Sequence, residues 1–396
     1  MPIQPFSIAR LPRIEFGQGT LSTLPGILQQ YGNHALLVTG SHSIEQGNYW
    51  QLIVDSLTTI NCKWEQVKIN QEPSPELVDN IVKQFKHEQF DVVVGIGGGS
   101  VLDAAKAIAG LLLINHSVMD FLEGVGPELS YPGPAVPFIA VPTTAGTGSE
   151  ATKNAVLSKQ GKDGFKKSFR DDQLVAEHAI IDPDLLTSCP PSLIAANGMD
   201  ALTQIMESFV STKSNILTDA LAISGLRCCR EGLLNWYEQK NNQAVARESM
   251  AYASLISGIN LAQTGLGSVH GLASPLGAFF PVPHGVVCGT LLASATKMNI
   301  EAMLLREPDN LALDKYARIA TILCNKKFKQ KTEAFSALIE LLNNWTDVMQ
   351  LKKLREYDVN VNDHEKITQH CRGSSMLTNP IVLTDSEIKN ILAERT

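Results

Sequence analysis

The sequence predicts an N-terminal α/β domain with a parallel sheet over residues 1–187 and an all-α domain over residues 188–396. Two observations predict this division. Short β-type runs alternate with helical patterns up to about residue 187, and this alternation is typical of a parallel sheet with right-handed crossovers. From about residue 188 the β signals stop, and Pro190 and Pro191 mark the boundary. A chain of 396 residues is long enough for two or three domains.

The strands expected in the first half are short apolar runs at 35–40, 62–69, 91–97, 137–144 and 179–182. The run DVVVGIG at 91–97 is uninterrupted, which is typical of a strand buried on both faces. Helical spacing covers 45–57, 74–87 and 100–113, and Ser74 is suited to cap the second of these helices.

The second half is read as helices throughout. Pro190 and Pro191 suit the start of a helix over 189–211, because proline is tolerated in the first turn. Long helical patterns then fill 216–262, 289–304, 311–325 and 331–350.

The composition indicates a soluble, cytoplasmic protein. The net charge is −7 and there is no block of five basic residues, which argues against a nucleic acid or an anionic membrane as partner. The seven cysteines are scattered without a CxxC pair, as expected for reduced thiols in a reducing compartment. The longest strongly apolar run, at 107–114, is far shorter than the roughly 20 residues of a membrane span.

Two polar loops follow predicted strands. In VVVGIGGGSVLDAAKA (92–107), Gly97, Gly98 and Gly99 leave their backbone N–H groups open to an anion, and Ser100 is expected at the helix N-cap. VPTTAGTGSEAT (141–152) adds five hydroxyl side chains after the next apolar run. The first loop departs from the Gly-x-Gly-x-x-Gly fingerprint, so ordinary turn chemistry is an alternative. Two such loops at the carboxyl ends of neighbouring strands favour a ligand site.

The stretch SVHGLASPLGAFFPVPHG (268–285) carries His270 and His284 in a segment without charge. Two interpretations are open for these imidazoles: hydrogen-bonded core histidines, or two ligands of a metal ion.

Taken together, five segments resemble the iron-containing (group III) alcohol dehydrogenases. They are VVVGIGGGSVLDAAKAIA, VPTTAGTGSEAT, AIIDPDLL, GMDALTQIMESFVS and VHGLASPLGAFFPVPHG, in the order of that family. The resemblance implies a nucleotide-binding α/β domain and a helical domain that binds metal and substrate, an architecture shared with dehydroquinate synthases. It implies NAD(P), a divalent metal, a small alcohol or aldehyde as substrate, and a homodimer.

The resemblance also implies cofactor-binding residues. These are Gly40, Gly97, Gly98, Gly99, Ser100, Asp103, Thr143, Thr144, Ser149, Asn154, Lys166 and Leu185. Relatives that favour NAD often carry an aspartate where this sequence has Gly40. Because glycine does not repel a 2′-phosphate, NADP is favoured over NAD, with Ser41, His42 and Ser43 as nearby donors.

By the same resemblance, Asp200, His270 and His284 are metal ligands, and Gln204 stands where the family has a third histidine. Gln204 coordinates through its carbonyl oxygen, or water replaces it, or the site is too weak to hold metal. Fe²⁺ is the expected ion, with Zn²⁺ and Mn²⁺ as alternatives.

The expected catalytic residues are His270, Asp200 and Ser274. Ser274 stands where relatives carry a proton-handling histidine, and it is able to relay a proton through water. Glu207 is either a solvated residue or one that orients a ligand.

Three functions compete with a metal-assisted alcohol dehydrogenase. A metal-independent reductase on the same fold, similar to maleylacetate reductases, needs no complete ligand set. A lyase similar to the dehydroquinate synthases is disfavoured because their metal-binding glutamate is not seen and no basic cluster is present. A non-catalytic nucleotide-binding relative would explain the two replaced histidines.

Overall fold

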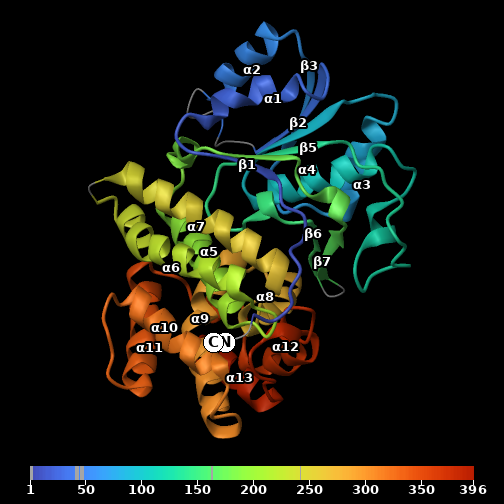
Figure 1. Ribbon diagram of the computed structural model, residues 1–396. Coiled ribbons are helices and arrows are strands. Elements are labelled where there is room, and N and C mark those ends of the chain that lie inside the picture. The colour runs from blue at the N-terminus through green and yellow to red at the C-terminus, as the bar shows by residue number, and fades with distance from the viewer. Residues whose placement is uncertain (1–2, 41–43, 45–48, 162–163, 241) are drawn as a thin grey trace. The chain divides into compact units, whose positions relative to one another are not determined.

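The computed structural model describes residues 3–40, 44, 49–161, 164–240 and 242–396. By its internal contacts the chain forms two compact units (Figure 1). The α/β unit comprises Ala9–Lys159 and Lys166–Cys189, and the helical unit comprises Met1–Ile8, Gln160–Phe165 and Pro190–Thr396. Sequence patterns gave no sign that the short segments 1–8 and 160–165 belong with the helices. Within the described residues, no helix has both the length and the apolarity needed to cross a membrane.

The predicted parallel sheet is confirmed. Six strands pair in the order β1-β8-β5-β4-β2-β3, and each adjacent pair is parallel. Their bounds are β1 (Arg13–Phe16), β8 (His178–Ile181), β5 (Phe138–Pro142), β4 (Val92–Gly97), β2 (His34–Gly40) and β3 (Lys63–Ile69). Strand β4 is buried along its whole length, as its uninterrupted apolar run predicts. A separate two-stranded sheet, β6 (Asn154–Lys159) and β7 (Phe165–Arg170), has no counterpart in the sequence prediction.

Helices cover the large sheet. They are α1 (Leu24–Leu28), α2 (Tyr49–Thr59), α3 (Pro75–Gln84) and α4 (Gly99–Leu111). Buried side chains of α1 and α2 join those of β2, β4 and β5 in one apolar core, and α4 packs on β4 and β5. The Ser74 side chain accepts from the Leu77 amide and caps α3 as predicted. The predicted N-cap at Ser100 is wrong: Gly98 is the N-cap of α4, because the tight turn after β4 starts the helix two residues earlier.

The helical unit contains nine α-helices in its described residues. They are α5 (Pro191–Val210), α6 (Ile216–Tyr237), α7 (Gln243–Thr264), α8 (Ser268–Phe279), α9 (His284–Arg306), α10 (Leu311–Leu323), α11 (Lys331–Val348), α12 (His364–His370) and α13 (Asp385–Ala393). The helical pattern over 216–262 is two helices, because Gln239 and Asn242 adopt positive φ between them. The Gly- and Pro-rich stretch 268–285 forms α8 and the start of α9, which periodicity did not indicate.

A buried lysine joins α4 to the loop that follows β5. Lys106 Nζ lies 2.8 Å from the Ser149 carbonyl oxygen, 2.6 Å from that of Asn154 and 3.1 Å from the Thr152 hydroxyl. The Ser149 hydroxyl donates to Asp103. Burial lowers the pKa of Lys106 to about 8 against the opposing effect of Asp103. These contacts hold the second polar loop on α4.

Helix α9 approaches the backbone of α5 closely because two of its residues lack a Cβ. A Cβ added to Gly285 would lie 2.5 Å from the carbonyl oxygen of Ala196, and one added to Gly289 would lie 2.8 Å from the Cβ of Met199. A larger residue at Gly285 therefore forces the two helices apart.

We predict that Glu150→Gln flattens the pH dependence of stability. Burial raises the pKa of the Glu150 carboxyl to about 7 from its ordinary 4.5, so the folded state holds the proton more tightly. The unfolding free energy of the wild type is therefore intact below pH 4.5 and falls as the pH rises to about 7, by roughly 3 kcal/mol at about 1.4 kcal/mol per pH unit. Thermal unfolding at several pH values measures this fall. Glu88→Gln, at an exposed position, is the control and should show the same fall as the wild type. Equal pH profiles for the wild type and Glu150→Gln would show the prediction to be wrong.

Gly285→Ala is expected to destabilise the protein by about 1–3 kcal/mol, because the added methyl group meets the α5 backbone. Gly373→Ala is the matched control, since a Cβ there has nothing within 4 Å. Chemical denaturation of both variants measures the difference. Equal denaturation midpoints for the two variants would mean that the contact at Gly285 does not limit how closely α5 and α9 pack.

Candidate functional site

The two polar loops of the α/β unit lie side by side. Strands β4 and β5 are neighbours, and the Thr143 amide donates to the Gly97 carbonyl at 3.0 Å. A Cβ on Gly98 would lie 3.2 Å from the Thr144 side chain, and one on Gly99 would lie 2.5 Å from that of Thr147. The glycines therefore allow the loops to pack against each other at the N-terminus of α4, where backbone N–H groups favour an anion.

The other expected cofactor residues lie in several environments. Asp103, Ser149 and the Asn154 carbonyl surround Lys106, as described above. Lys166 forms an ion pair with Glu72 at 2.9 Å. Leu185 is part of the apolar core of the α/β unit. Gly40 is the last residue of β2, and Ser41, His42 and Ser43 fall outside the described residues.

Four side chains of the helical unit bring potential metal ligands together. Asp200 is on α5, His270 on α8, and His284 and Cys288 on α9, and one ligand atom of each lies within 4.8 Å of all the others. His270 Nε2 is 3.3 Å from Asp200 Oδ1, and His284 Nε2 is 3.9 Å from the same oxygen. Three of the four are buried, whereas the His284 side chain is 28% exposed and offers access to the cluster.

Glu207 fixes the orientation of His270. Its Oε2 lies 2.7 Å from His270 Nδ1, and its Oε1 accepts from the Val269 amide at 2.6 Å. A neutral imidazole that donates from Nδ1 has its lone pair on Nε2, the nitrogen that faces Asp200. The interpretation of Glu207 as a solvated residue is wrong, because the side chain is buried and paired with His270.

Polar side chains hold the start of α8. The Ser268 amide donates to Asn379 Oδ1 at 3.0 Å, while Val269 donates to Glu207. Asn379 is itself held by Asn299, because Asn379 Nδ2 donates to Asn299 Oδ1 at 2.8 Å. Gly267 precedes the helix, and a Cβ there would lie 2.9 Å from both Asn379 Oδ1 and Glu207 Oε1. Asn379 and Glu207 therefore cap the N-terminal end of α8, and His270 is the third residue of this helix.

Gln204 and Ser274 lie one helical turn after Asp200 and His270. Gln204 is buried on α5, and its Oε1 accepts from the Ser257 hydroxyl of α7 at 2.8 Å. Ser274 is half-buried on α8.

The ionisable groups of the cluster shift one another's pKa values. Burial opposes ionisation of Asp200, but His284 and His270 outweigh it and lower the pKa of this carboxyl. Burial also opposes protonation of His270, and Cys288, Asp200 and Glu207 outweigh it and raise its pKa well above the ordinary value. Burial raises the pKa of the Cys288 thiol to about 12. The carboxylates thus favour a cation at this position, either a proton or a metal ion.

The donors fit a divalent metal. Asp200 Oδ1 is buried and accepts no hydrogen bond from the described part of the chain. His270 Nε2 faces this oxygen at 3.3 Å, and because the pKa of His270 is raised, a metal ion that binds there would displace the proton of Nε2. A carboxylate oxygen and an imidazole nitrogen, once that nitrogen has lost its proton, are typical ligands of Fe²⁺ or Zn²⁺.

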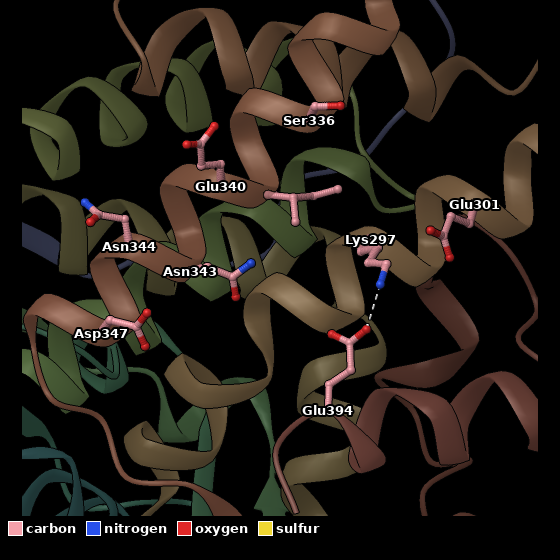
Figure 2. A pocket seen from close by; sticks show the side chains of 9 residues that line it. Lys297, Glu301, Ser336, Glu340, Asn343, Asn344, Asp347 and Glu394 are labelled. Carbon is pink, nitrogen blue, oxygen red and sulfur yellow. Dashed lines mark hydrogen bonds and ion pairs between the residues drawn. The ribbon is translucent and has the colours of Figure 1, made fainter.

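A surface pocket of about 680 Å³ is lined by residues of α9, α11 and the end of α13, and none of the four clustered side chains is among them (Figure 2). Its lining is polar, and Lys297 and Glu394 pair across it at 2.8 Å. None of the expected site residues lines this pocket.

Cys288 was missed by sequence reasoning. Its signal was the spacing of four from His284, which places both on one face of a helix. The helical pattern predicted over 289–304 does not include this pair, because α9 begins five residues earlier, at His284.

Comparisons with known proteins agree with this arrangement. The family described as "Iron-containing alcohol dehydrogenase" matches residues 12–183, and its C-terminal counterpart, "Fe-containing alcohol dehydrogenase family, C-terminal", matches residues 194–396.

Individual relatives match over most of their length. Alcohol dehydrogenase 4 of Saccharomyces cerevisiae is 33% identical over 81% of this chain and 80% of its own. Lactaldehyde reductase of Escherichia coli is 32% identical over 72% of this chain and 74% of its own. The crystal structure of an archaeal alcohol dehydrogenase from a Red Sea brine pool, bound to NZQ, superposes with a TM-score of 0.90 at 27% identity and covers 100% of both chains. The chain therefore belongs to the iron-containing alcohol dehydrogenase family.

Proposed function

We propose that the chain catalyses NAD(P)-dependent, metal-assisted hydride transfer between the nicotinamide and a small alcohol or carbonyl compound. The observation that carries this proposal is the Glu207–His270 pair, which turns Nε2 of the imidazole towards Asp200. A carboxylate behind a histidine is the usual support for a metal-binding imidazole.

Asp200, His270 and His284 would hold the metal ion, for which Fe²⁺ is our first assignment. Bound there, the metal supplies a Lewis acid that polarises the oxygen of the alcohol or carbonyl group. Glu207 keeps the proton of His270 on Nδ1, so that Nε2 remains a ligand. Ser274, one turn after His270, relays a proton between the substrate oxygen and water, since its hydroxyl both donates and accepts.

The α/β unit would bind the nucleotide. Backbone N–H groups at Gly97, Gly98 and Gly99 and the N-terminus of α4 suit a pyrophosphate. We assign NADP in preference to NAD, because Gly40 ends β2 without a carboxylate that would repel a 2′-phosphate.

His270→Ala is expected to lower turnover by at least about a hundredfold while nucleotide binding persists, because a ligand is lost from the helical unit alone. Alcohol oxidation is followed by nucleotide absorbance, and binding of NADPH and NADH by fluorescence, with NADPH expected to bind more tightly. Exposed His87→Ala is the control. Full activity of His270→Ala, or an unchanged rate of the wild type after removal of its metal, would refute the metal-assisted mechanism.

Glu207→Gln is expected to weaken metal binding by about 10–100-fold. The amide replaces one of the two acceptor oxygens that Val269 and His270 use, so the imidazole loses its fixed proton position. Metal retention against a graded chelator measures the change, and Glu248→Gln, at an exposed site on α7, is the control. Added metal should restore activity, which separates this effect from misfolding. Unchanged retention would mean that Glu207 does not orient the ligand.

A further inference from the structure

Cys288 is placed to contact the same ion as the three proposed ligands. It is fully buried on α9, one turn after His284. Its Sγ lies 3.6 Å from His270 Nε2 and 3.8 Å from His284 Nε2. A cysteine that merely fills a core has no reason to face two imidazole nitrogens and a carboxylate.

The separations match the edges of a tetrahedral metal site. With bonds of about 2.1 Å to nitrogen and oxygen and about 2.3 Å to sulfur, a nitrogen lies about 3.4 Å from an oxygen ligand and about 3.6 Å from a sulfur ligand. The distance from His270 Nε2 to Asp200 Oδ1 is 3.3 Å, and the two sulfur–nitrogen distances are 3.6 and 3.8 Å. The 3.8 Å between Cys288 Sγ and His284 Nε2 and the 3.9 Å between His284 Nε2 and Asp200 Oδ1 are longer than these edges, and both involve His284.

Gln204 has another partner. Its Oε1 accepts from Ser257, so the amide is held towards α7. The position at which the resemblance implies a third histidine is therefore engaged in a helix–helix contact, and the sulfur of Cys288 is a fourth donor from a different helix.

We propose that Cys288 is the fourth protein ligand of the metal, as a thiolate, in place of the imidazole that Gln204 has replaced. The inference rests on the proposed metal site. Binding transfers the thiol proton to solvent and forms one metal–sulfur bond. Because thiolate is a softer ligand than imidazole, the set of Asp200, His270, His284 and Cys288 selects Zn²⁺, Co²⁺ or Fe²⁺ over Mn²⁺.

Cobalt spectroscopy tests the ligand directly. The full-length protein is stripped of metal, loaded with Co²⁺ and recorded without nucleotide. We expect one Co²⁺ per chain and a sulfur-to-metal charge-transfer band in the near ultraviolet for the wild type and for Cys229→Ser, a buried cysteine on α6. The band should be lost in Cys288→Ser, whose affinity for Zn²⁺ should fall by on the order of a hundredfold or more.

X-ray absorption of the Zn²⁺-loaded wild type needs no variant, so it remains decisive if Cys288→Ser fails to fold. One sulfur at about 2.3 Å supports the proposal. Stoichiometric metal with only nitrogen and oxygen neighbours overturns the Cys288 assignment and leaves the proposed function standing. A wild type that binds no metal overturns both.

Discussion

Two carboxylates are buried on one helix of the helical unit, and the arrangement of the neighbouring helices depends on how each of them is partnered. Asp200 and Glu207 lie two turns apart on α5, and neither reaches water to a useful extent. A buried charge requires a partner of opposite sign or a set of donors. Glu207 obtains them from the Val269 amide and the His270 imidazole, and so fixes α8 on α5. Asp200 keeps one oxygen without a hydrogen-bond donor in the described chain, and that deficit makes the cluster a place for a cation.

Much of the fold was predictable because local patterns decide it. Strands β4 and β5 are continuous apolar runs, and α3 carries its own capping serine, so neither needs a distant partner to be recognised. Helix α8 was not predictable. It contains Pro275, and its first amides are satisfied by Glu207 and Asn379 from other parts of the chain. The boundary between α6 and α7 depends on left-handed residues at Gln239 and Asn242, which a helical pattern does not reveal.

The candidate site likewise has residues that sequence motifs identify and residues whose role depends on tertiary contacts. The histidines and Asp200 were found through motifs that resemble a family, and the structure brings them together. Two interpretations of Glu207 are open from the sequence, because α5 is buried on nearly every face and spacing does not identify the partner of a carboxylate on it. Cys288 could not be identified from the sequence, because its place in the cluster depends on α9 beginning at His284 and on the glycines that bring α9 close to α5. Such information resides in tertiary contacts rather than in any local pattern.

The contact between Asn379 and Ser268 has a consequence for the order of events during synthesis. A ribosome delivers the proposed metal ligands on α5, α8 and α9 well before Asn379. Until that residue arrives, the first amide of α8 lacks its acceptor, and the helix end that carries His270 is incomplete. The end of α8 that carries His270 is therefore completed by a side chain 111 positions further along the chain.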